Sequence, residues 1–166
     1  PGYSRTYLQG KNHDLYRRSL YTYWKRTVPP PSMATFDAPE REFCLVRRSR
    51  TNTPLQAFVM LHDPQFIEAA RHLAARMMTA SKSTEERIAF GFRVITARKP
   101  SPREIQILSR LYTKRMAHYQ ANPKAAVSLL TIGESTTPQH QSPTELAAWT
   151  TVARTMLNLS EAITKN

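Results

Sequence analysis

The sequence predicts a mainly α-helical fold, and two observations carry this prediction. The first is a repeated dipeptide, in which a side chain that can accept a hydrogen bond is followed by proline. Such a side chain caps a helix N-terminus, and proline is tolerated at the first helical position because its missing N–H would have no partner there. The dipeptides are Thr53-Pro54, Asp63-Pro64, Ser101-Pro102, Asn122-Pro123 and Ser142-Pro143.

The second observation is the helical spacing of apolar residues behind these caps. The predicted core faces are Phe66, Ala70, Leu73 and Met77; Ile88, Phe92 and Ile95; Ile105, Leu108, Tyr112 and Tyr119; and Leu146, Trp149, Ala153 and Met156. We interpret these aromatic and methionine stripes as core packing rather than as a cofactor pocket. The result is a helical bundle of about five to six helices.

Glutamate positions refine the predicted helix starts. Capping boxes are predicted at Ser83 with Glu86, Ser101 with Glu104, and Ser142 with Glu145, because glutamate follows each serine by three residues. We expect helices to begin near Pro54, Pro64, Thr84, Pro102, Pro123 and Pro143.

The first 52 residues have a different pattern. Residues Arg18–Thr27 alternate in a way that favours one short strand, although a helix capped near Asp14 remains the alternative. The prolines at 29–31 break any regular element, and residues 32–52 are expected to form an ordered, irregular segment.

We therefore divide the chain into a linker remnant (1–13) and a single C-terminal helical domain (14–166), with the strand or irregular segment at 14–52 and the bundle at 53–166. A start at proline without methionine is typical of an excised fragment.

The charge of the chain favours acidic partners. Lysine and arginine number 24 against 12 aspartate and glutamate residues, a formal net charge of +12. Such a balance suits an anionic polysaccharide, an acidic protein surface, an anionic membrane surface or nucleic acid. The basic, aromatic run Arg17–Arg26 has the composition of a stacking surface for single strands, but no nucleic-acid-binding motif is present, so we expect no such partner. No apolar run approaches the roughly 20 residues of a membrane span.

The candidate binding site is a cluster of arginines before a helix start. Arg47, Arg48 and Arg50 lead through Asn52 to the predicted cap at Thr53. Guanidinium groups beside a helix N-terminus suit an anion or an acidic partner. The alternative, which we favour, is structural: Asp37, Glu40 and Glu42 lie just upstream and are candidates for ion pairs with these arginines.

The sequence offers little support for a metal site, a reactive cysteine or a catalytic motif. The catalytic residues, if any, are unknown. Glu68 and His72 share a helix face, but no second histidine lies at metal-ligand spacing, so no metal is expected. Cys44 is the one cysteine, and its neighbours Phe43 and Leu45 predict that it is buried. No nucleophile elbow and no glycine-rich phosphate loop is present.

Several blocks together resemble one family. They are FDAPERE (36–42), TNTPLQA (51–57) and DPQF (63–66), followed by the final stretch ELAAWTTVARTMLNLSEAITKN (145–166). From residue 14 onward the chain resembles the planctomycete-specific C-terminal domain of unknown function that is found in multidomain proteins with a planctomycete c-type cytochrome domain. His62 departs from the pattern, because asparagine is expected before Asp63.

The resemblance implies a setting rather than a reaction. The parent would be a large exported protein, so the location would be extracytoplasmic, periplasmic or secreted. Haem would be held only in a separate cytochrome domain, so no cofactor is expected in this chain. The favoured function is noncatalytic docking to preceding domains or binding of an anionic polymer. The alternatives are part of an enzyme active site completed by another domain, and a basic nucleic-acid-binding domain.

Overall fold

The computed structural model describes residues 7–25, 28–40, 42–47, 49–136 and 141–164. The chain divides into two compact units, residues 1–59 and residues 60–166, and each is described here by itself. In the described part of the chain, no helix has both the length and the apolar character that crossing a membrane requires.

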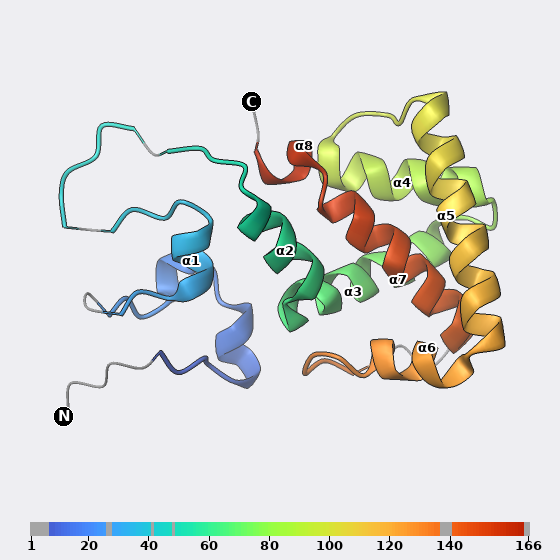
Figure 1. The fold of residues 1–166 in the computed structure, drawn as a ribbon, viewed down its shortest axis with the longest axis horizontal. Helices are drawn as coiled ribbons and strands as arrows, with labels where there is room; N and C mark the ends of the chain where they lie inside the picture. Colours follow the sequence, from blue (N-terminus) through green and yellow to red (C-terminus); the bar gives the residue numbers. More distant parts are fainter. Residues whose placement is uncertain (1–6, 26–27, 41, 48, 137–140, 165–166) are drawn as a thin grey trace. The chain divides into compact units, whose positions relative to one another are not determined.

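All six predicted helix starts are confirmed. The helices are α2 (Pro54–His62), α3 (Pro64–Ala80), α4 (Thr84–Thr96), α5 (Pro102–Ala121), α6 (Pro123–Leu130) and α7 (Pro143–Leu157). Two short helices, α1 (Pro31–Thr35) and α8 (Ser160–Ile163), were not predicted, so the described residues form eight α-helices. The mainly α-helical bundle is therefore confirmed (Figure 1).

The predicted caps form only in part. At α5 the capping box is complete, since the Ser101 hydroxyl accepts a hydrogen bond from the Glu104 amide at 3.3 Å and the Glu104 carboxylate accepts one from the Ser101 amide at 2.6 Å. The boxes predicted at α4 and α7 are wrong, because neither Ser83 nor Ser142 makes a side-chain cap. Their glutamates have other partners: Ser81 donates to Glu86, and Arg87 donates to Glu145.

The core of the 60–166 unit is built around α7. This helix packs against α3, α4, α5 and α6, and Figure 1 shows it between α3 and α5. Trp149 is fully buried, and its ring stacks on that of Tyr112 with centroids 4.3 Å apart. Most of the predicted apolar faces supply this core, as the buried residues Met77, Ile88 and Phe92 illustrate.

One close contact in this core involves Gly91 of α4. A Cβ atom at this position would lie 2.7 Å from Sδ of Met77 and 2.9 Å from Cε of Met156. Both methionines are fully buried. Glycine therefore lets α4 approach these two side chains more closely than a residue with a Cβ atom could without moving them.

The 1–59 unit has little core of its own. Among its described residues only Pro30 and Gln56 are buried. It contains two 3₁₀ helices, η1 (Asn12–Tyr16) and η2 (Ser19–Tyr21), besides α1. The predicted strand at Arg18–Thr27 is wrong over its described residues, 18–25. Its flanks at Arg18 and Thr22 are extended, but they have no partner strand among the described residues, and an extended segment needs one to form a ladder.

Candidate functional site

The predicted arginine cluster lies on an exposed part of the 1–59 unit. Arg47 and Arg50 are both exposed, and Arg48 lies outside the described residues. Of the remaining two predicted binding residues, Asn52 is exposed, and Thr53 caps α2 by accepting from the Gln56 amide at 3.2 Å.

The three acidic residues predicted to hold these arginines have different settings. Asp37, in the left-handed region at φ 57°, accepts hydrogen bonds from the Thr51 amide at 2.8 Å and from the Thr51 hydroxyl at 2.9 Å. Glu40 and Glu42 are exposed. A pairing of these carboxylates with the arginines stays a prediction. The Asp37 contact instead brings together two positions 14 residues apart in the sequence.

Gln56 makes further hydrogen bonds that hold the two ends of this segment together. Its side chain is almost fully buried and donates to the Thr35 carbonyl and to the Thr51 hydroxyl, both at 2.9 Å. Its side-chain oxygen accepts from the Thr53 amide at 3.1 Å, which forms a capping box at α2 that was not predicted. The segment between Asp37 and Thr51 is therefore a loop whose two ends are fixed to each other and to α2.

The far part of this loop exposes apolar side chains beside the arginines. We call residues 42–47 and 49–50 the apolar–basic loop. Phe43 is 70% exposed, Leu45 57% and Val46 fully. The predicted burial of Cys44 is wrong, since the thiol is exposed. The apolar neighbours that predicted its burial, Phe43 and Leu45, are themselves exposed.

A buried polar cluster in the 60–166 unit involves α3 and the segment after α6. Arg71 is 1% exposed and donates to the carbonyls of Leu130, Ile132 (3.0 Å) and Ser135 (2.7 Å). Glu68, also buried, accepts from the Glu134 amide at 2.8 Å. The bond to Leu130, the last residue of α6, satisfies a carbonyl that the helix C-terminus leaves without a partner. The arrangement fastens residues 130–135 to α3.

The same cluster places a histidine on a serine hydroxyl. Nε2 of His72 lies 2.7 Å from Oγ of Ser135, and Arg71 donates to that oxygen at 2.7 Å. The sequence placed Glu68 and His72 on one helix face, and both side chains contact the 130–135 segment. Because Arg71 also binds three carbonyls, we assign the histidine–serine contact to the same structural role. The described residues contain no group of three or more metal-ligating side chains, and the expected absence of a metal stays a prediction.

Arg87 of α4 makes a comparable junction between helices. Its guanidinium donates to the Ser81 carbonyl and to the Glu145 carboxylate, both at 2.6 Å, and lies 5.6 Å from the Trp149 ring centre. Burial, together with the nearby Glu145 carboxylate, raises the pKa of Tyr112, which stacks on the same tryptophan. This junction ties α3, α4 and α7 together.

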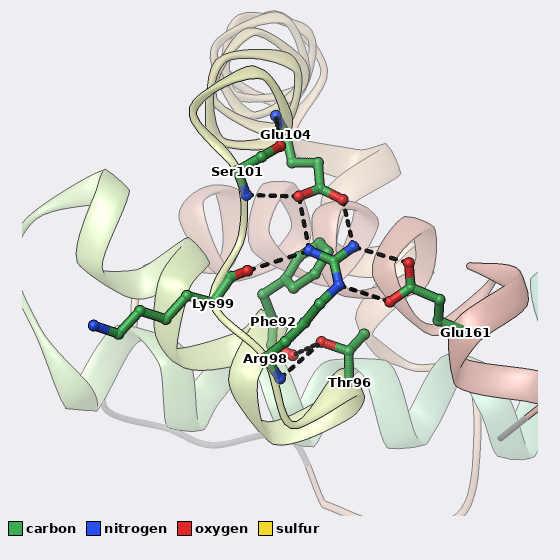
Figure 2. A network of polar contacts seen from close by, with 7 residues as sticks. All are labelled: Phe92, Thr96, Arg98, Lys99, Ser101, Glu104 and Glu161. Atoms are coloured by element: carbon green, nitrogen blue, oxygen red, sulfur yellow. Dashed lines mark hydrogen bonds and ion pairs between the residues drawn. The ribbon is translucent and has the colours of Figure 1, made fainter. Parts of the chain in front are cut away.

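Arg98 forms an ion-pair network with two carboxylates, shown in Figure 2. Its guanidinium donates to the Glu104 carboxylate at 2.7 and 3.0 Å and to the Glu161 carboxylate at 2.8 and 2.9 Å. It also lies over the Phe92 ring, 4.7 Å from the centre. The hydrogen bonds from Arg98, helped by the Ser101 amide, hold the pKa of Glu104 at about 2, and Arg98 likewise lowers the pKa of Glu161. The network joins the start of α5 to α8.

This network gives the folded protein an acid-sensitive contact. Because the pKa of Glu104 falls from 4.5 to about 2 on folding, the ionised carboxylate stabilises the fold. Its contribution is complete above pH 4.5 and is lost as the pH falls through 2. We expect Glu104→Gln to flatten the pH dependence of the free energy of unfolding between pH 5 and pH 2. Urea titrations across this range measure it, with Glu85→Gln, an exposed α4 residue, as the control. Equal slopes for both variants would contradict this assignment.

A shallow groove lies along the solvent face of α5. Its volume is about 590 Å³, and it is lined by Glu85, Pro102, Ile105, Gln106, Ser109, Arg110, Thr113 and Lys114. The lining is mostly polar side chains of one helix. Sequence reasoning did not single out this face, since its charged positions are those expected of a solvated helix.

Taken together, the fold and these clusters define a basic, helical module with an exposed apolar–basic loop. The chain belongs to the PSD1 family, a protein of unknown function (DUF1553), whose family model matches residues 1–112. No curated protein and no solved structure matches the chain.

Proposed function

We propose that this chain is a noncatalytic docking module whose apolar–basic loop binds an acidic protein surface. The observation that carries the proposal is the exposure of Phe43, Leu45 and Val46 directly beside Arg47. Contiguous exposed apolar residues rimmed by charge are typical of protein-binding surfaces. A net charge of +12 makes an acidic partner the favoured one.

The apolar side chains favour a protein over an anionic polysaccharide. A polyanion neutralises arginines but leaves phenylalanine, leucine and valine in water. Burying each such side chain contributes roughly 1.5–3 kcal/mol, which only a partner with apolar surface of its own provides. The proposed partner therefore combines carboxylates with apolar side chains.

The closed base of the loop also supports binding. The Thr51–Asp37 and Gln56–Thr35 hydrogen bonds restrain both ends of the loop before any partner arrives. Such restraint reduces the conformational entropy that is lost on binding.

The setting is a further part of the proposal and rests on the resemblance described above. We propose that the module is the C-terminal part of an exported, cytochrome-associated multidomain protein of planctomycete type, and that its partner is a preceding domain of that parent. Haem would then be carried by the separate cytochrome domain.

A pair of synthetic polymers tests the loop. We expect the chain to bind a glutamate–tyrosine copolymer about tenfold more tightly than polyglutamate, because only the copolymer offers apolar groups to the loop. The double variant Phe43→Ser, Val46→Ser should remove this preference, whereas Arg47→Gln, Arg50→Gln should weaken binding to both polymers. Fluorescence anisotropy with labelled polymers measures both effects.

The control for the apolar part is Val127→Ser, which removes an exposed valine of α6, 52% exposed, far from the loop in sequence. It should bind like the parent chain.

Heparin retention tests the alternative that the loop binds polyanions through charge alone. If heparin binds as tightly as the copolymer and the Phe43→Ser, Val46→Ser variant is retained equally well, the loop binds polyanions through charge alone and the proposal is wrong.

A further inference from the structure

The 60–166 unit contains a second basic site, formed where α5 meets α7. We propose that Arg115 and Arg154 together bind a tetrahedral oxyanion, a sulfate or phosphate group. This site lies outside the apolar–basic loop and is independent of the docking function proposed above.

The geometry is set by a contact between the two helices. The Tyr119 hydroxyl of α5 lies 3.3 Å from the Thr151 hydroxyl of α7. Arg115 precedes Tyr119 by four residues and Arg154 follows Thr151 by three, so each arginine lies one helical turn from the contact, on the same side of its helix. Both arginine side chains are half-buried.

The two guanidinium groups have few partners for the donors they carry. Arg154 donates to the Leu61 carbonyl, near the end of α2. The Nε atoms of Arg115 and Arg154 are both buried and have no hydrogen-bond partner among the described residues. A buried, unused donor on a charged group is costly, and native proteins rarely leave one without a role.

The charges are also uncompensated. No ion pair of Arg115 or Arg154 with a carboxylate is found among the described residues. Burial and the positive charge of Arg115 lower the pKa of Arg154, and only Tyr119 acts in the opposite direction. Two cations that share a partly dry site repel each other, and a bound anion would relieve this repulsion.

The donor set indicates the kind of anion. Each guanidinium presents parallel N–H groups that fit the oxygens of a sulfate or phosphate. The two hydroxyls of the junction already have acceptors, since Thr151 donates to the Ala147 carbonyl and Tyr119 to Thr151, so the arginines are the donors for the anion. A group with two negative charges matches two arginines. The group could be a free ion or an ester on a larger molecule, and both share this chemistry.

Thermal unfolding in low-millimolar sodium sulfate tests the site, with chloride adjusted to constant ionic strength. At ten times the dissociation constant we expect the midpoint of the parent chain to rise by about 3–5 °C. Arg115→Gln should abolish this rise while leaving the chain folded, because Arg115 makes no hydrogen bond that holds two helices together. Isothermal titration with sulfate should show the same loss of binding.

Arg103→Gln is the matched control, since Arg103 is an exposed arginine of the same helix. It should keep the full rise in the midpoint, and so should the loop variant Arg47→Gln, Arg50→Gln. Repeating the titration with 4-nitrophenyl sulfate separates the sources: comparable affinity means that the site takes an esterified group, and much weaker affinity means that it takes the free ion. A sulfate-dependent rise of equal size in Arg115→Gln, or no rise in the parent chain, would overturn the proposal.

Discussion

Replacing Arg71 with methionine should lower the free energy of unfolding by about 3–5 kcal/mol. Methionine fills much of the same volume but cannot donate to the carbonyls of Leu130, Ile132 and Ser135. Those groups would stay in a poorly hydrated region without their charged donor, and each such loss costs about 1–3 kcal/mol. Urea denaturation followed by circular dichroism measures the change.

The matched control is Arg76→Met on the same helix. Arg76 is exposed and lies 5.8 Å from the Phe90 ring centre, a contact worth about 0.5–1 kcal/mol at an exposed site. If Arg71→Met destabilises the protein no more than Arg76→Met, the carbonyl contacts of Arg71 do not hold the 130–135 segment in place.

Trp149→Ala should have an effect of similar size, about 3–5 kcal/mol. The indole is fully buried in the centre of α7 and stacks on Tyr112, so its removal leaves a cavity between α5 and α7. Trp149→Phe should cost less, because a ring remains to fill part of the space and to stack on Tyr112. Urea denaturation measures both variants.

Ile107→Ala on α5 serves as the control, since this side chain is 54% exposed. It should change the free energy of unfolding by well under 1 kcal/mol. Nearly equal stabilities for Trp149→Ala and Ile107→Ala would mean that the core is not packed around α7 as described.

The helix starts could be predicted from the sequence because their causes are local. A cap side chain and the proline after it lie next to each other, so nothing distant is needed to recognise Asp63-Pro64 or Ser101-Pro102. Glu104 could also be assigned, since its own cap serine is its nearest donor. Where a distant arginine competes, the local rule failed: Arg87 binds Glu145, and the box at α7 does not form.

The residues of the two proposed binding sites were harder to predict for the same reason. Arg115 and Arg154 are 39 residues apart and have no shared local pattern, and only the packing of α5 on α7 brings their charges together. At Arg47 and Arg50 the sequence identified the basic cluster. It did not identify the exposure of Phe43 and Val46, because an apolar run in the sequence is the same whether it is buried or not.

The packing of two methionines on Gly91 has a consequence for oxidative damage. Met77 and Met156 are both fully buried, so peroxide reaches their sulfur atoms only when the helices separate. Oxidation to the sulfoxide would add a polar oxygen to a side chain that lies among apolar core residues. A sulfoxide at either position would therefore weaken the packing of α4 against α3 and α7 until a reductase restores the thioether.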